Sequence, residues 1–301
     1  MRPSAIAPRR TVQIGLHRPA AQVFDDVTRR IAAVTPPGHS PDWPRRRITF
    51  RRVRAKVWFL GGGPGASDLL TVRAGRVLGE ADVVIWGQSL LSGEAVREYA
   101  RAEAELVPWP PATTSDIYAA YDRAVRDELL VAHVCWGDPA LYGGVRREAR
   151  EARSRGLPVE VVPGVSSLGA AAAVLCTELT QAPNDPPPLI LAAPRDDPPP
   201  AQRIRNLASH GSTMAFFMAG KRGADLQAEL LAGGFPWDTP CAVAHRVSRP
   251  DEVVLTCRLD QLAETMNDPE LDRHTMVLAG PALEDDPLPS ASPSVIPTAP
   301  G

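Results

Sequence analysis

The stretch that most constrains the fold runs from residue 57 to residue 74 and reads VWFLGGGPGASDLLTVRA. Its first four residues are apolar and predict a buried strand. The next five, from Gly61 to Gly65, carry almost no side chains, and an Ala-Ser-Asp step then leads into an amphipathic segment that predicts a capped helix. Because glycine accepts positive φ and lets a ligand approach the main chain, this strand–loop–helix unit is a candidate binding site.

One interpretation of the loop is a dinucleotide site, because Gly61, Gly63 and Ala66 match G-x-G-x-x-A between a strand and a helix. That interpretation needs an acidic residue at the carboxyl end of the second strand, where it would hold ribose hydroxyls. Asp82 instead lies at the start of the second apolar run, which ends in Trp86-Gly87-Gln88. No Gly-Lys-Ser/Thr follows the loop, so a nucleotide-triphosphate loop is excluded more firmly.

The composition argues against several classes of function. The chain has 33 basic and 35 acidic residues, a net charge of −2 that gives no reason to expect a nucleic-acid partner. No apolar run approaches membrane-spanning length and the N-terminus lacks a signal-like apolar stretch, so we expect no membrane partner and a cytoplasmic location. Cys135, Cys176, Cys241 and Cys257 form no C-x-x-C pair and the six histidines show no ligand spacing, which predicts free thiols and no bound metal.

The sequence divides into four regions. Residues 1–55 carry arginine runs and a Pro/Gly/Ser stretch around one short amphipathic segment, so we expect a partly disordered N-terminal extension; a docking segment is the alternative. Strands and helices then alternate, which predicts an N-terminal α/β domain with the glycine-rich loop over 56–176 and a C-terminal α/β domain over 177–283. Residues 284–301 are acidic, then rich in proline and serine, and predict a disordered tail.

The apolar runs of the N-terminal domain are nearly continuous, which is typical of strands buried in a mostly parallel sheet. The C-terminal domain is predicted to hold a smaller, mixed sheet. Strands are predicted at 57–60, 81–86, 104–107, 129–135, 158–162, 189–192, 212–218, 241–245, 252–257 and 275–279. Helices are predicted at 94–102, 115–128 (from a Ser115 cap), 166–176, 204–210, 224–232 and 259–266, with another that ends at 155.

Three predicted strands of the first sheet end in turns rich in glycine or proline, at Gly61, Trp136 and Pro163. Ligands bind beyond the carboxyl ends of strands in open α/β sheets, so we expect these turns to line one crevice. Asp138 lies in the second turn, and its carboxylate suits either a hydrogen bond to a cofactor or the cap of a helix. The helix predicted at 166–176 has small side chains that allow close packing against a neighbouring element or a flat ligand.

No Ser-His-Asp or Cys-His arrangement is evident from order or spacing, so the catalytic residues stay unknown. His133 lies within a predicted strand and is expected in the core. His245 and Arg246 end a strand of the second domain and are better site candidates. The absence of an obvious nucleophile favours chemistry in which a cofactor is reactive and the protein places it.

Three segments, in this order and spacing, resemble the motifs of the tetrapyrrole methylases: the stretch 57–74, HVCWGDPALYGG from His133, and VEVVPGVSSLGAAAAVL from Val159. TMVLAGPAL from Thr275 resembles the final strand of that family, so the resemblance runs from about 57 to 283. It implies two α/β domains with the active-site cleft between them. It also implies methyl transfer from S-adenosylmethionine to a tetrapyrrole, and a homodimer.

Within the family, GDPALYG, PGVSS, IWGQSLLSGE and HRVSRPDEVVLTCRLDQLAE look most like the branch that methylates precorrin-4 at C11 in cobalamin biosynthesis. The acidic D-R-L-V segment of the uroporphyrinogen methylases is absent, and the ribosomal-RNA and diphthamide branches fit less well. The chain departs from the precorrin-4 pattern where it reads LTQAPNDPPPLILAAPRDD, without the expected Ser-Gln-Thr, and where Trp136 replaces a small residue. These departures leave open another precorrin or a specialised metabolite as acceptor, and a non-catalytic cofactor-binding relative.

Carried over by position, the resemblance implies cofactor contacts at Pro64, Trp136, Gly137, Asp138, Leu141, Ser166, Ser167, Met218 and Arg246. It places the glycine loop beside the tetrapyrrole substrate, with Gly61, Gly62, Gly63 and Gly65 as substrate-binding residues. Arginines are expected to meet the acetate and propionate groups of such a substrate. Arg73, Arg246 and Arg249 are the candidates, with solvation at the surface as the alternative for Arg249.

Overall fold

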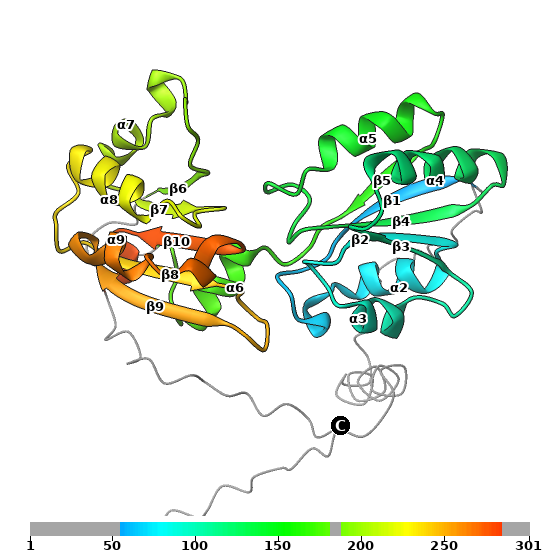
Figure 1. Cartoon of the computed structure of the whole chain (residues 1–301), viewed down its shortest axis with the longest axis horizontal. Helices are drawn as coiled ribbons and strands as arrows, with labels where there is room; N and C mark the ends of the chain where they lie inside the picture. The colour runs from blue at the N-terminus through cyan, green and yellow to red at the C-terminus, as the bar shows by residue number, and fades with distance from the viewer. Residues whose placement is uncertain (1–54, 181–187, 285–301) are drawn as a thin grey trace, which may run out of the picture. The chain divides into compact units, whose positions relative to one another are not determined.

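The computed structural model of the chain describes residues 55–180 and 188–284. These described residues belong to one compact unit, which contains two five-stranded sheets. We call each sheet with its helices a lobe, the first lobe ending with β5 and the second beginning with α6 (Figure 1). The predicted N-terminal extension and tail lie, apart from residues 55 and 284, outside the described part, so both stay predictions.

The first lobe is built on a parallel sheet with the strand order β3-β2-β4-β1-β5. β1 pairs with β4 on one side and β5 on the other, so the glycine loop that follows β1 is flanked by the loops after those two strands. The order confirms the mostly parallel sheet that the apolar runs predict. The strands are β1 (Lys56–Gly61), β2 (Val83–Gly87), β3 (Glu105–Trp109), β4 (Leu130–Cys135) and β5 (Val159–Val162).

Helices cover both faces of this sheet. Successive residues of a strand point to opposite sides, so each apolar strand presents side chains to both layers of helices. Val57 and Phe59 of β1 pack with side chains of α4 and α5, whereas Trp58 and Leu60 pack with side chains of α2 and α3. Figure 1 shows these two pairs of helices on opposite sides of the sheet. The helices are η1 (Ser67–Leu69), α2 (Val72–Glu80), α3 (Gly93–Tyr99), α4 (Thr114–Arg126) and α5 (Val145–Ser154).

The second lobe is built on a mixed sheet with the strand order β6-β7-β10-β8-β9. β6 and β7 run parallel, and the other neighbours run antiparallel, which confirms the mixed sheet predicted for this region. The strands are β6 (Leu189–Ala192), β7 (Thr213–Phe216), β8 (Pro240–His245), β9 (Val253–Arg258) and β10 (Thr275–Ala279).

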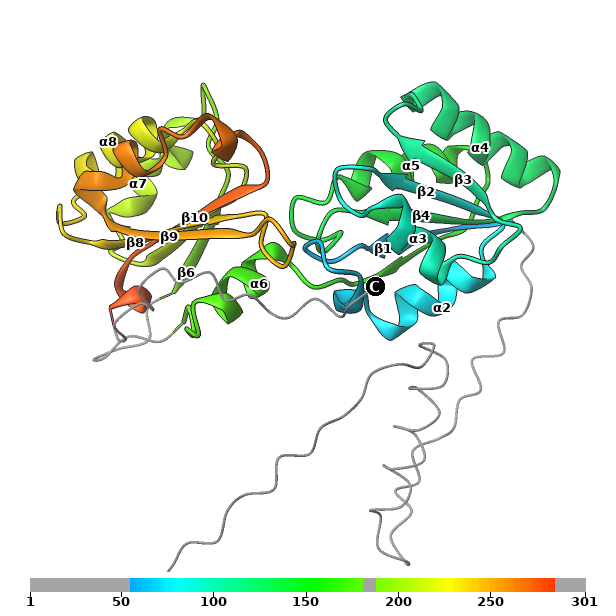
Figure 2. The same ribbon diagram turned by 60° about the horizontal axis from the view of Figure 1, so that its bottom comes forward.

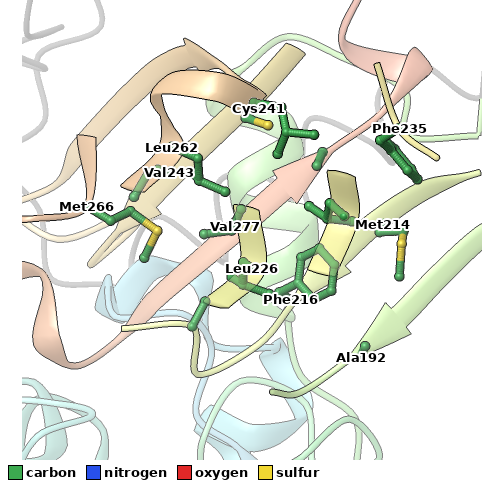
Figure 3. Close-up of a cluster of buried hydrophobic side chains, with 14 of the residues drawn as sticks. Ala192, Met214, Phe216, Leu226, Phe235, Cys241, Val243, Leu262, Met266 and Val277 are labelled. Carbon is green, nitrogen blue, oxygen red and sulfur yellow. The ribbon is translucent and has the colours of Figure 1, made fainter. Parts of the chain in front are cut away.

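The second sheet is also covered on both faces. Side chains of α7, α8 and α9 pack on one face, and side chains of α6 pack on the other. Figure 2 shows α7 and α8 on the opposite side of this sheet from α6. Figure 3 shows the first of these clusters, in which Leu226 of α8 and Leu262 of α9 gather with Phe216, Val243 and Val277 of the strands. Each fully buried side chain of this size contributes about 1.5–3 kcal/mol. The helices are α6 (Ser167–Val174), η2 (Pro200–Gln202), α7 (Ile204–Ala208), α8 (Gly223–Ala232), η3 (Leu259–Gln261), α9 (Leu262–Thr265), η4 (Pro269–Asp272) and η5 (Pro281–Leu283).

The small-residue helix α6 packs on the second sheet, although the sequence analysis placed it in the N-terminal domain. Ala170, Ala171 and Leu175 share a buried cluster with Ala215 and Leu278 of that sheet. Packing against a neighbouring element therefore accounts for its buried alanines. The domain boundary after residue 176 stays a prediction.

One predicted helix cap is wrong. α4 begins at Thr114 and not at Ser115, because Thr113 is its cap. Thr113 Oγ1 accepts from Asp116 N–H at 3.3 Å, and Asp116 Oδ2 accepts from Thr113 N–H at 2.7 Å. This reciprocal pair satisfies two backbone donors at once, which a Ser115 cap would not do.

His133 lies within β4, as predicted, and belongs to the structural core of the first lobe. Its Nδ1 is 2.6 Å from the hydroxyl of Tyr121 on α4. Burial lowers the pKa of His133 to about 4, so the imidazole is neutral near pH 7.

No helix among the described residues is long and apolar enough to cross a membrane.

Candidate functional site

The loops after β1, β4 and β5 meet at the carboxyl edge of the first sheet. Gly63 and Gly137 form an isolated antiparallel bridge, in which Gly137 N–H donates to Gly63 O at 3.1 Å and Gly63 N–H donates to Gly137 O at 3.3 Å. Gly164 N–H donates to Asp138 Oδ2 at 2.9 Å, which ties the third loop to the second. The three turns therefore lie together, as the sequence predicts.

Close packing of these loops on one another requires glycine at several positions. A Cβ atom on Gly61 would lie less than 3.0 Å from backbone atoms of Gly164, and one on Gly164 would lie less than 3.0 Å from Gly137 O. A Cβ atom on Gly62 would meet two side chains beneath the loop at the same short range. Glycine is therefore needed at these positions because the main chains of the loops cross closely. The sequence analysis had explained the same glycines by the approach of a ligand to the main chain.

Asp138 joins two loops through both of its carboxylate oxygens. Oδ1 accepts from Ala140 N–H at 2.7 Å, within its own turn, and Oδ2 accepts from Gly164 N–H. Neither bond caps a helix, so of the two roles predicted for this carboxylate the helix cap is wrong. The observed role is to fix the positions of two loops, since each carboxylate oxygen accepts from a main-chain N–H of a different loop.

Trp136 fills the space above the end of β2. Its indole atoms occupy the volume that a Cβ on Gly87 would need, at less than 3.0 Å, and the ring meets Trp109 edge-on with centroids 5.7 Å apart. The bulky residue that departs from the family pattern is therefore accommodated by a glycine on the neighbouring strand.

The second lobe contributes residues from three strand ends. Met218 follows β7 and Arg246 follows β8, with φ of 55° and 49°, values that are uncommon for residues with side chains. A residue with positive φ ends the extended backbone of the strand. Each of these two strands therefore ends at a residue that lines the cavity described below. The start of β10 supplies the third contribution, at Thr275 and Met276.

A cavity of about 470 Å³ is lined by these loops of both lobes. Its volume is typical of a small-molecule site. Every residue predicted to contact the cofactor lines this one cavity: Pro64, Trp136, Gly137, Asp138, Leu141, Ser166, Ser167, Met218 and Arg246.

Arg246 is the most unusual polar group of the cavity. Its guanidinium pairs with Asp251, but its Nε is buried and has no hydrogen-bond partner among the described residues. Leaving a buried donor unpaired costs about 1–3 kcal/mol, so a ligand atom that accepts from Nε would remove that cost. The preceding His245 is buried behind the cavity, where its Nδ1 lies 2.9 Å from Thr275 Oγ1. Burial, and then the charge of Arg246, lowers the pKa of His245.

The family model for tetrapyrrole (corrin/porphyrin) methylases matches residues 56–263, more than half of the chain. The chain belongs to the tetrapyrrole methylases. The resemblance of its motifs to that family is thereby confirmed.

Named relatives and solved structures agree with this membership. Cobalt-precorrin-4 C(11)-methyltransferase of Methanocaldococcus jannaschii is 33% identical over 230 residues, which cover 76% of this chain and 88% of that protein. The X-ray structure of a cobalamin biosynthetic enzyme, cobalt precorrin-4 methyltransferase, matches with a TM-score of 0.72 and 30% identity, over 78% of this chain and 98% of that one. Uroporphyrin-III C-methyl transferase from Thermus thermophilus, complexed with S-adenyl homocysteine, matches with a TM-score of 0.61 and 26% identity, over 76% and 98%.

In this tetrapyrrole methylase, only one of the loop glycines predicted to face the substrate lines the cavity. Gly63 lines the cavity, whereas Gly61 and Gly62 are buried where the loops cross. Gly65 lies beside a side chain of the second lobe. Arg73 is exposed on α2 and is not a lining residue of the cavity.

Sequence reasoning missed several lining residues, and most of them lie next to strand ends. Ser89 and Leu90 come shortly after β2, and Arg273 and His274 come just before β10. Applying the strand-end rule to every predicted strand would have found Ser89 and Leu90. Arg273 and His274 precede the amino end of β10, which lies at the cavity because β10 runs antiparallel to β8. The alternative of surface solvation for Arg249 is wrong, because its guanidinium donates to main-chain carbonyls of the first lobe.

Proposed function

We propose that this chain is an S-adenosylmethionine-dependent C-methyltransferase that acts on precorrin-4 at C11 in cobalamin biosynthesis. The observation that carries the proposal is the gathering of all nine predicted cofactor residues in one cavity. The proposed acceptor is inferred from the relatives, since two proteins named as cobalt-precorrin-4 methyltransferases are similar to most of the chain.

The residues of the cavity fit the methyl donor. Trp136, Leu141 and Met218 offer apolar and soft surface for an adenosine group, and Arg246 Nε offers a buried donor that lacks a partner. Ser166, the cap residue of α6, adds a polar group to the lining. When bound, S-adenosylmethionine supplies an electrophilic methyl group on a sulfonium.

The chain's own contribution is placement. The main chain of the first lobe and the side chains of the second fix the two sides of the cavity, so that a ring carbon of the acceptor can meet the methyl group in line. Such positioning is worth up to about 7–11 kcal/mol in favourable systems. No described side chain is assigned as a general base, so the exclusion of water and the orientation of the acceptor carry the mechanism.

The direct test is methyl transfer to defined acceptors. Purified full-length protein is incubated with S-adenosylmethionine and precorrin-4, with and without cobalt, and the product is read by mass and by NMR of the methylated carbon. One added methyl group at C11 is the expected result. The likeness to a uroporphyrin-III methyl transferase supports a second candidate, so uroporphyrinogen III and other precorrins form the comparison panel. Methylation of a panel member but not of precorrin-4 would replace the proposed acceptor.

A non-catalytic relative would behave differently. It would bind S-adenosylhomocysteine by calorimetry and transfer no methyl group to any member of the panel. Absence of both binding and transfer would overturn the proposed function as a whole.

We also propose that the protein acts as a homodimer in the cytoplasm, with no metal, nucleic acid or membrane as a partner. Light scattering of the purified protein tests the dimer, and elemental analysis tests the metal. In the parts of the chain that the structure describes, no three His, Cys, Asp or Glu side chains gather as a metal site.

A further inference from the structure

A braced loop of the second lobe reaches the first lobe beside the cavity. We call residues 246–252, between β8 and β9, the bridging loop. Inside it, Arg246 pairs with Asp251, and Ser248 N–H donates to Glu252 Oε2 at 2.5 Å. Arg249 N–H donates to Arg246 O at 3.1 Å, and Glu252 N–H to Arg249 O at 3.0 Å. These bonds give the loop a defined shape, with Ser248 at a φ of 68°.

Two side chains of the bridging loop bond to the first lobe. Ser248 Oγ accepts from Ala66 N–H at 3.1 Å, in the glycine-rich loop. Arg249 Nη2 donates to Leu90 O at 3.0 Å and also to Ser89 O, in the loop after β2. The Arg249 stem lies against Gly65, where a Cβ would come within 3.0 Å of Arg249 Cγ.

The partners of Arg249 are unusual for a guanidinium. Within residues 55–180 and 188–284 no ion pair joins it to a carboxylate, and its printed acceptors are both main-chain carbonyls. Burial is the main cause that lowers the pKa of Arg249, while the nearby Asp251 opposes the shift. Main-chain acceptors define position more closely than a flexible acidic side chain would, because they move only with the loop itself.

This contact lies at the cavity. Ser89, Leu90 and Arg249 all line it. A second contact joins the lobes elsewhere on the lining, where the rings of Tyr142 and Phe217 lie with centroids 4.8 Å apart. The ring contact is nonpolar and adaptable, whereas the Arg249 contact sets specific distances between named atoms.

We infer that Arg249 is a positioning residue, whose guanidinium holds the two walls of the cavity at the spacing that binding of the methyl donor needs. The effect on the ligand rests on the proposed function; the contact between the lobes does not. Loss of the guanidinium would remove the bonds to Ser89 and Leu90, leave Ser248 as the remaining polar tie of the bridging loop to the first lobe, and leave both sheets intact.

The test compares the full-length protein with Arg249→Met, which keeps an unbranched stem and removes the guanidinium, and with Arg249→Lys, which keeps the charge. Arg258→Ala is the control, since Arg258, the last residue of β9, pairs with Asp260 and does not line the cavity. Hydrogen exchange of the unliganded proteins is measured at Ala66 and over residues 87–91. Calorimetry then measures the affinity for S-adenosylhomocysteine.

We expect Arg249→Met to speed exchange at Ala66 and residues 87–91 while strand amides keep their protection. We expect its affinity for S-adenosylhomocysteine to fall about tenfold, with Arg249→Lys within about threefold of wild type and Arg258→Ala unchanged. If Arg249→Met does not fold, Ser248→Ala tests the same contact through the Ala66 amide.

Unchanged exchange in Arg249→Met and Ser248→Ala would overturn the contact. Faster exchange with unchanged affinity would overturn the positioning role. If the wild type itself fails to bind S-adenosylhomocysteine, the proposed function fails, and the exchange data still decide whether the contact between the lobes exists.

Discussion

The two walls of the cavity are built by different means. In the first lobe, main-chain atoms of three loops cross so closely that glycine is required at Gly61 and Gly164, and Asp138 ties two of the loops together. In the second lobe, side chains such as Met218 and Arg246 project from residues with positive φ at strand ends. The difference indicates that substitutions in the first wall should mainly change stability, and substitutions in the second wall should mainly change binding.

The largest effect is expected for Gly164→Ala. The added Cβ would come within 3.0 Å of backbone atoms in two other loops, and backbone cannot give way as a flexible side chain can. We expect a loss of about 4 kcal/mol or more in the free energy of unfolding, measured with urea. Gly169→Ala is the matched control, because its Cβ meets nothing within 4 Å and helices favour alanine. Equal stability of the two variants would contradict the idea that close crossing of backbones in the first wall is needed for stability.

The acid stability of the protein should depend most on the core of the first lobe. His133 titrates near pH 6.5 in the unfolded chain and near pH 4 in the folded one, so the unfolded chain binds the extra proton in between. Its contribution is complete above about pH 6.5 and is lost as the pH falls toward 4, for a total of about 3 kcal/mol.

His133→Gln should therefore flatten the pH profile of urea unfolding over that interval. His274→Gln, in the second wall, should also flatten the profile, because burial and then the charge of Arg249 lower the pKa of His274. A His133→Gln profile as steep as that of the wild type would show that this histidine is not buried in its neutral form.

An intermediate effect is expected for Asp138. Asp138→Ala removes acceptors from Ala140 N–H and Gly164 N–H and should cost about 2 kcal/mol in unfolding free energy. Asp138→Asn keeps one acceptor oxygen and should lose about half as much. Both variants should also bind S-adenosylhomocysteine more weakly in calorimetry, since the residue lines the cavity. If Asp138→Ala kept full stability and only bound the ligand more weakly, Asp138 would be a ligand contact and would not be needed to fix the two loops.

The smallest effect on stability is expected for Met218→Ala. Met218 is 65% exposed, so its truncation should change the free energy of unfolding by no more than about 0.5 kcal/mol. Affinity for S-adenosylhomocysteine should nevertheless fall about threefold, because the thioether lines the cavity. A large loss of stability without any change in affinity would place Met218 with the residues of the first wall.

The first wall could be predicted from the sequence because its parts are short motifs at strand ends. The apolar runs before Gly61 and Trp136 marked the strands, and the topology of a parallel sheet brought their ends together. What spacing alone could not show is that Gly61 faces another loop and not a ligand. That fact depends on the crossing of Gly164, about a hundred residues later.

The second wall was harder to predict from the sequence. Met218 came from the family resemblance alone, whereas Arg246 was also a candidate because it follows a predicted strand. Arg249 was a candidate for the acidic groups of the substrate, with solvation at the surface as the alternative, and neither role is the contact that the structure shows. Its bonds to Ser89 and Leu90 arise only when two lobes meet, which a reading of local sequence does not reveal.

The account's central claim is that both walls together bind the methyl donor, and a crystal structure of the protein with S-adenosylhomocysteine tests it most directly. The predicted result is density for the ligand in the cavity, with main-chain contacts at Pro64 and Gly137 and a bond accepted from Arg246 Nε. Density that touches only one lobe, or that lies outside the cavity, would contradict the claim.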